Sequence, residues 1–275
     1  MLTDYHVHLR RDLVEARFDD AFSAANVERY RDAAGAAGIA ELGVSEHIHR
    51  FEQCLAIWDH PFWREQATDD IERYCAYVRE ETDLRLGLEV DFVPGREDRT
   101  QNLIERGDYD YIVGSVHLLG DLAVDFDRYD IWEQAHNPEA VWARYFETLA
   151  QAASSGLFDI LAHPDLVKMW GTARPAPSGD VRRYYEPALE AIAASGIAVE
   201  VSTSGLRKPV GEIYPARDFL DGVLATGAPI ALSSDAHLPQ QIGFAYDRAL
   251  ELLDAAGVRE LAVFDRRERR LEPIG

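Results

Sequence analysis

The chain has 275 residues, of which 47% are hydrophobic, so it is long enough to bury one large core. Its formal net charge of −21 disfavours binding to nucleic-acid phosphates. The two cysteines form no Cys-x-x-Cys pair and imply neither a disulfide framework nor a thiolate zinc site. The first residues lack a signal-peptide pattern, and no apolar run approaches the ~20 residues of a membrane span. We therefore expect one cytoplasmic domain, residues 1–275, with no nucleic-acid or membrane partner; the pattern leaves the oligomeric state open.

Short β-type runs alternate with helical patterns along the chain. In chain order, the predicted strands are residues 3–8, 41–46, 85–92, 109–116, 158–163, 197–202, 230–234 and 261–264. The predicted helices are residues 26–37, 69–81, 138–155, 185–195 and 215–226. Four of them are followed directly by a glycine, where a left-handed C-terminal cap favours that residue. This alternation predicts an α/β fold with a parallel sheet, and the number of units favours a barrel over an open sheet.

Most of the nine histidines fall at the end of a predicted strand. The residues placed in this way are His6, His8, His47, His117, His163 and His237, together with the carboxylates Glu89 and Asp235. In a parallel α/β barrel all these strand ends share one face, where such enzymes carry out their chemistry. The alternation of a strand also points the two rings of His6-Val7-His8 to the same side. We therefore expect these side chains to lie together at that end of the barrel, which we call its mouth.

A mixed set of imidazoles and carboxylates favours Zn, Mn or Fe over Ca or Mg alone. Eight ligands exceed the roughly four that one tetrahedral zinc takes. We therefore expect two to three divalent metal ions, with Glu89 able to bridge two of them. His49, His60 and His136 follow no strand end, and we interpret them as surface or packing residues.

Short segments carry a resemblance to a known superfamily. Residues 4–8, 45–47, 87–92, 114–117, 162–165 and 233–237 resemble, in that order, the motifs of the PHP superfamily. Residues 200–209 and 212–215 resemble its histidinol-phosphatase branch. The match extends from residue 4 to about residue 245, which is nearly the whole chain.

The resemblance implies a distorted (β/α)7 barrel with a trinuclear metal site at the C-terminal ends of its strands. One metal would bind His6, His8, Glu89 and Asp235, a second would bind Glu89, His117 and His163, and the third would bind His47, His237 and a residue of the loop after the first strand. Relatives have histidine or aspartate in that loop. Here Glu15 fits the usual spacing better, and Asp12 is the alternative.

The reaction implied by the resemblance is hydrolysis of L-histidinol phosphate to L-histidinol and phosphate, a step of histidine biosynthesis. The substrate would be a small phosphate ester, with Glu89 and Asp235 as catalytic residues. Either Asp235 or a metal-bound water could assist the leaving alkoxide, and the sequence does not choose between them.

The two lysines also point to a phosphate site. The chain has 28 lysines and arginines, but its only lysines, Lys168 and Lys208, both follow strand-end motifs. An ammonium group suits a single phosphate oxygen, while the neighbouring Arg207 can bind phosphate with two donors. We therefore predict that these three residues bind substrate, with Arg50 as a further candidate.

Three alternative functions stay open at this point. The protein could be a PHP phosphoesterase that acts on another small phosphate ester, such as a nucleotide. It could be a catalytically silent barrel that binds metal for stability or serves as a partner-binding module. It could also be a metal-dependent amidohydrolase, although those barrels commonly use a metal-bridging lysine and neither lysine here ends a strand.

Overall fold

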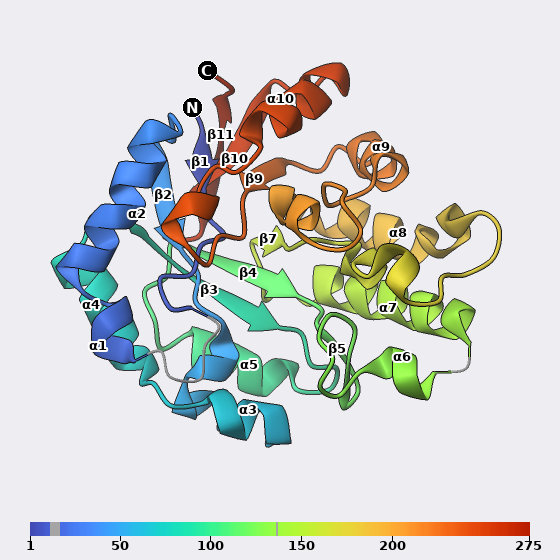
Figure 1. The fold of residues 1–275 in the computed structure, drawn as a ribbon, viewed down its shortest axis with the longest axis horizontal. Helices are drawn as coiled ribbons and strands as arrows, with labels where there is room; N and C mark the ends of the chain where they lie inside the picture. The colour runs from blue at the N-terminus through green and yellow to red at the C-terminus, as the bar shows by residue number, and fades with distance from the viewer. Residues whose placement is uncertain (12–16, 136) are drawn as a thin grey trace.

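A seven-stranded parallel sheet forms the centre of the molecule in this computed structural model, which describes residues 1–11, 17–135 and 137–275 (Figure 1). Its strands, in spatial order, are β1 (Thr3–Asp4), β2 (Glu41–Val44), β3 (Arg85–Asp91), β4 (Tyr111–Ser115), β7 (Ile160–Leu161), β8 (Ala198–Ser202) and β9 (Ile230–Ser233). Each neighbouring pair is parallel. The expected parallel α/β arrangement is confirmed.

The sheet closes on itself just beyond β1 and β9. Val7 and Ala236 form an isolated parallel bridge, in which the His8 amide donates to the Ala236 carbonyl at 2.8 Å. Two residues before Ala236, the Ser234 amide donates to Asp4 Oδ1 at 2.9 Å. These contacts join the first and last strands, so the predicted distorted (β/α)7 barrel is confirmed.

Helices surround the sheet and connect its strands (Figure 1). The long helices are α2 (Ala24–Ala36), α4 (Ile71–Glu81), α5 (Glu97–Ile104), α7 (Pro138–Ser154), α8 (Glu186–Ser195), α9 (Arg217–Ala225) and α10 (Tyr246–Ala255), and the shorter ones are α1 (Phe18–Ala21), α3 (Pro61–Gln66) and α6 (Ile131–Gln134). Local signals define several ends: the Asn137 side chain caps α7 ahead of Pro138, and Gly196 ends α8 at φ +65°. The five predicted helices are present within two residues at each end, while α5 and α10 were not predicted. No helix in the described part of the chain is long and apolar enough to cross a membrane.

A C-terminal hairpin covers one end of the barrel. It consists of β10 (Glu260–Asp265) and β11 (Glu268–Pro273), so the strand expected at residues 261–264 pairs outside the barrel sheet. Phe264 packs against Tyr5 and Tyr111 in a small apolar cluster. Arg267 donates to Asp159 Oδ2 at 2.8 Å, just before β7 begins. The hairpin therefore covers the N-terminal ends of the strands and leaves their C-terminal ends for the site.

Several predicted strands were too long. The first was expected over residues 3–8, but its regular pairing ends at Asp4, and the strand expected over residues 158–163 pairs regularly only at Ile160–Leu161. At both ends the chain leaves the sheet ladder: Val7 changes partner to Ala236, and His163 adopts φ +23°. The residues beyond these points present side chains to the mouth instead of continuing a strand.

Candidate metal centre

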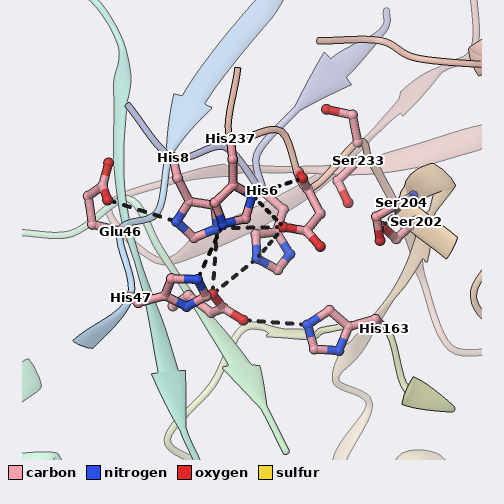
Figure 2. A network of polar contacts seen from close by, with 12 residues as sticks. His6, His8, Glu46, His47, His163, Ser202, Ser204, Ser233 and His237 are labelled. Atoms are coloured by element: carbon pink, nitrogen blue, oxygen red, sulfur yellow. Dashed lines mark hydrogen bonds and ion pairs between the residues drawn. The ribbon is translucent and has the colours of Figure 1, made fainter. Parts of the chain in front are cut away.

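The eight ligands predicted in the described residues meet at the C-terminal end of the barrel. His6 and His8 follow β1, His47 follows β2, Glu89 lies in β3, His117 follows β4, His163 follows β7, and Asp235 and His237 follow β9. Figure 2 shows His6, His8, His47, His163 and His237 around a common space. Three groups of ligand atoms lie within 4.8 Å of one another: His6, His8 and Asp235; His6, Glu89 and His163; and His8, His47 and His237.

Glu89 lies at the centre of this cluster, and its two oxygens face different histidines. Oε2 lies 3.3 Å from His6 Nε2 and 3.6 Å from His8 Nε2, and it also contacts His47 Nδ1. Oε1 lies 3.5 Å from His117 Nε2 and 3.4 Å from His163 Nε2. This division between two sets of nitrogens is the arrangement that a bridging carboxylate needs.

The spacing of the donor atoms fits bound cations. Ligand atoms about 2.1 Å from a tetrahedral zinc lie roughly 3.4 Å from one another. Asp235 Oδ1 lies 3.8 Å from His6 Nε2 and 3.7 Å from His8 Nε2. These two Nε2 atoms are buried and have no hydrogen-bond partner among the described residues. Buried polar atoms are normally satisfied, so the donor set fits divalent metal ions.

Two buried carboxylates, to which the sequence alone assigns no role, contact the rings of two predicted ligands at Nδ1. Glu200 Oε1 lies 2.8 Å from His6 Nδ1, and Asp91 Oδ1 lies 2.6 Å from His117 Nδ1. Such contacts at Nδ1 leave Nε2 directed toward the centre of the cluster. Glu200 Oε2 also accepts from the His163 amide at 2.6 Å, and so connects two of the predicted ligands. A charged residue within an otherwise apolar buried strand is the sequence signal that could have identified Glu200.

The electrostatics follow from this crowding of opposite charges in a buried space. Burial disfavours the charged form of Glu89, but His47, His6 and His117 hold its pKa well below the usual range. Burial opposes protonation of His6, yet Glu200 and Glu89 hold its pKa well above the usual value. Burial, His237 and His47 together lower the pKa of His8 well below the usual value, which leaves a neutral ring suited to metal ligation.

The backbone around Asp235 is unusual. Asp235 has φ +50°, a left-handed conformation that is uncommon for non-glycine residues and that clusters at functional sites. Arg207 Nη2 donates to the carbonyls of Ser234 and Asp235, at 2.8 Å each. The guanidinium therefore holds the turn that presents Asp235, while its Nη1 is buried without a partner in the described part of the chain.

The other predicted phosphate-binding residues differ in their surroundings. Lys208 is exposed at the mouth, where its charge lowers the pKa of Asp235 together with the nearer histidines. Lys168 Nζ lies 3.0 Å from both Asp165 Oδ2 and Glu212 Oε2. Arg50 donates to the Arg11 carbonyl at 3.1 Å and lies 3.7 Å from Glu46. Lys168 and Arg50 are thus engaged by acidic or carbonyl oxygens.

Two histidines that follow no predicted strand end, His60 and His49, are both buried. His60 is buried and caps α3 by accepting from the Phe62 amide, which is a packing role. His49 is also buried, but its ring stacks on His47 at 4.7 Å and its Nδ1 lies 3.6 Å from Asp91 Oδ2, so it belongs to the surroundings of the site. Glu15, Asp12 and His136 lie outside the described residues.

Known proteins share this fold and sequence. The PHP-domain family model matches residues 4–204. A probable histidinol-phosphatase from Deinococcus radiodurans is 34% identical over 250 residues, which is 89% of this chain and 91% of the relative. The histidinol-phosphatase of Bacillus subtilis is 30% identical over 67% of this chain and 77% of its own length. The structure of histidinol phosphate phosphatase from Lactococcus lactis, in complex with zinc, L-histidinol and phosphate, has a TM-score of 0.71 at 21% identity and covers 98% of both chains.

A closed barrel with a histidine- and carboxylate-lined mouth, matched by that family model over most of its length, defines the class: this chain belongs to the PHP family. The two relatives named above, a probable histidinol-phosphatase and a histidinol-phosphatase, match most of the chain. Within the family it therefore belongs to the histidinol-phosphatase branch.

Proposed function

We propose that this protein is a metal-dependent phosphoric monoester hydrolase that converts L-histidinol phosphate to L-histidinol and phosphate, a step of histidine biosynthesis. The observation that carries the proposal is the position of Glu89, whose two oxygens face two separate sets of histidine nitrogens at 3.3–3.6 Å. The matching relatives, which are histidinol-phosphatases, give the substrate.

The proposed centre holds two to three divalent ions: Zn, Mn or Fe. The ligand sets are His6, His8, Glu89 and Asp235 for one ion, Glu89, His117 and His163 for a second, and His47 and His237 with Glu15 or Asp12 for a third. Cations bound there would supply the Lewis acidity that phosphate-ester hydrolysis requires. The orphaned Nε2 atoms of His6 and His8 and the spacing around Glu89 support this assignment.

Residues of the chain itself orient the proposed metal ligands and would bind the phosphate. Glu200 and Asp91 hold the rings of His6 and His117 so that Nε2 faces inward. Arg207, through Nη1, and Lys208 are the proposed phosphate donors, because both lie at the mouth and neither is paired with a carboxylate of the described residues in the way that Lys168 is. Lys168 and Arg50 are the alternatives. We propose Asp235 as the residue that would assist the leaving alkoxide.

We further propose that residues 1–275 act as one cytoplasmic domain with a small phosphate ester as its partner and without nucleic acid. The net charge of −21 supports the last point, because it repels a polyanion.

A substrate panel tests the proposed function. The purified protein, loaded in turn with Zn, Mn or Fe, is assayed with L-histidinol phosphate, nucleoside monophosphates, other phosphate monoesters and a phosphodiester. We expect the highest kcat/KM with L-histidinol phosphate. A higher value with a nucleotide would assign the protein to the alternative PHP phosphoesterases, and no turnover with any ester would leave a barrel that binds metal without catalysis.

A further inference from the structure

The segment that follows His117 forms a small hairpin at the mouth of the barrel. It contains β5 (Leu118–Leu119) and β6 (Leu122–Ala123), which pair antiparallel. Directly after β6, the Val124 amide donates to the His117 carbonyl at 2.9 Å. The hairpin thus brings the chain back to the backbone of His117, a proposed metal ligand. The next residue in the chain is Asp125.

The backbone next to Asp125 is fixed by two indoles. The Val124 carbonyl accepts from Trp132 Nε1 at 3.0 Å and from Trp170 Nε1 at 2.8 Å. These tryptophans come from different parts of the chain, one in α6 and one after β7. These two donors hold the backbone carbonyl that directly precedes Asp125.

The Asp125 side chain has a buried oxygen without a partner. Its Oδ1 is buried and makes no hydrogen bond to any described residue. Burial raises the pKa of this carboxyl, and the nearby His117 and Lys208 oppose the rise. His117 follows β4 and Lys208 follows β8, so Asp125 lies near segments at the mouth of the barrel. It belongs to none of the groups of described ligand atoms that could hold a metal ion.

We propose that Asp125 binds the ammonium group of the substrate and so selects phosphate esters of β-amino alcohols over other phosphate monoesters. The inference rests on the proposed function. In L-histidinol phosphate the ammonium sits on the carbon next to the one that carries the phosphate ester. A group that binds this ammonium must therefore lie close to the phosphate donors, and Asp125 is near enough to the proposed donor Lys208 and the proposed ligand His117 to interact electrostatically with both.

The chemistry of the two groups is complementary. An ammonium has three N–H donors, and a carboxylate oxygen is an acceptor. A buried carboxylate oxygen without a donor is unfavourable, because it has lost its contacts to water. A bound ammonium would supply that donor and a compensating charge. An alkyl phosphate without an amine would leave the same oxygen unsatisfied, and this difference is the source of the selection.

The test compares Asp125→Asn with the wild-type holoenzyme on two matched pairs of esters. The first pair is L-histidinol phosphate and imidazolylpropyl phosphate, which lacks only the amine and the stereocentre. The second pair is O-phosphoethanolamine and ethyl phosphate. Loss of one charged hydrogen bond should lower kcat/KM by about ten- to a hundredfold for the amine esters. The amine-free esters should stay within about twofold of wild type.

Two further measurements separate ammonium binding from a structural role. L-Histidinol should bind the Asp125→Asn holoenzyme more weakly by calorimetry, while inhibition by inorganic phosphate and the metal content stay at wild-type values. Asp127→Asn is the matched control, because Asp127 lies in the same segment, is exposed and pairs with Arg174. It should leave both substrate pairs unchanged. Asp125→Ser, which also removes the charge, should reproduce the selective loss if the asparagine variant folds poorly.

The remaining outcomes overturn either the inference or the proposed function, and they can be told apart. Equal losses on both members of a pair, or loss of metal, would show that Asp125 acts through the metal site. Equal rates of the wild type on both members of each pair would show that the protein does not recognise the amine. If the wild type preferred O-phosphoethanolamine to ethyl phosphate but did not hydrolyse L-histidinol phosphate, the proposed function would fail and the ammonium site would stand.

Discussion

Glu200 and His6 form a buried carboxylate–imidazole pair in which Oε1 and Nδ1 lie 2.8 Å apart. The residues are 194 positions apart in the chain and come from β8 and the end of β1. The contact fixes the ring with Nε2 toward Glu89 and stabilises positive charge on the imidazole. Because Glu200 also binds the His163 amide, one side chain orients ligands of both proposed bridged ions.

We expect Glu200→Gln to weaken metal binding rather than to unfold the protein. The amide keeps the size of the side chain but removes the charge that supports His6, and loss of such an outer partner typically costs about 10- to 100-fold in metal affinity. Metal titration of the chelated protein measures this directly. Glu190→Gln, at an exposed position of α8, is the control. Unchanged affinity for every ion in Glu200→Gln would show that the pair is only a packing contact.

We expect Glu89→Gln to release more than one metal ion per chain and to lower kcat/KM by more than about 100-fold. Its two oxygens face different histidines, so removal of its charge disturbs both proposed ions together, and a direct ligand should matter more than an outer one. Elemental analysis and the phosphatase assay give the two readouts. Asp98→Asn, exposed in the helix that follows the same strand, should match the wild type. Loss of one ion alone would argue against a bridging role.

Metal binding should release protons and should strengthen as the pH rises. Burial opposes protonation of His117, but Asp91, Asp125 and Glu89 raise its pKa to about 10 in the metal-free protein. At neutral pH the ring is therefore protonated, and a metal ion must displace that proton. Below this pKa, the affinity should fall about tenfold per pH unit for each proton displaced. Calorimetry in buffers of different ionisation enthalpy counts the protons, and a count of zero would contradict this assignment.

The phosphate-binding candidates should separate by their effect on phosphate inhibition. Lys208→Ala should raise KM and weaken inhibition by inorganic phosphate, with a loss of about tenfold or more in kcat/KM for one charged hydrogen bond. Arg207→Lys should also lower kcat, because a lysine cannot hold both the Ser234 and Asp235 carbonyls as the guanidinium does. Lys168→Ala should leave phosphate inhibition near wild type, since Lys168 is already paired with two carboxylates. Weakened inhibition in Lys168→Ala alone would transfer the role to that residue.

The strand-end position of the histidines was enough to predict the ligand cluster, because strand order and side-chain alternation follow from local patterns. The helix α10 was not predicted, since it begins after Ala245 at φ +53° and has no side-chain cap that the sequence would reveal. Glu200, Asp91 and Asp125 escaped assignment for another reason: their roles depend on partners that only the closed barrel brings near. His49 looked unrelated to the site, but a short turn after β2 places it against Asp91.

The bridge between Val7 and Ala236 has a consequence for how the protein acquires its activity. His6 and His8 lie on one side of that bridge and Asp235 and His237 on the other, while the neighbouring pair Asp4 and Ser234 is 230 positions apart in the chain. A partly synthesised or partly folded chain therefore holds only fragments of the ligand set and cannot retain its ions with full affinity. Occupancy of the proposed ion that binds His6, His8, Glu89 and Asp235 should thus report closure of the barrel. The proposed ligands of the second ion, Glu89, His117 and His163, all lie in the middle of the chain and do not span this bridge.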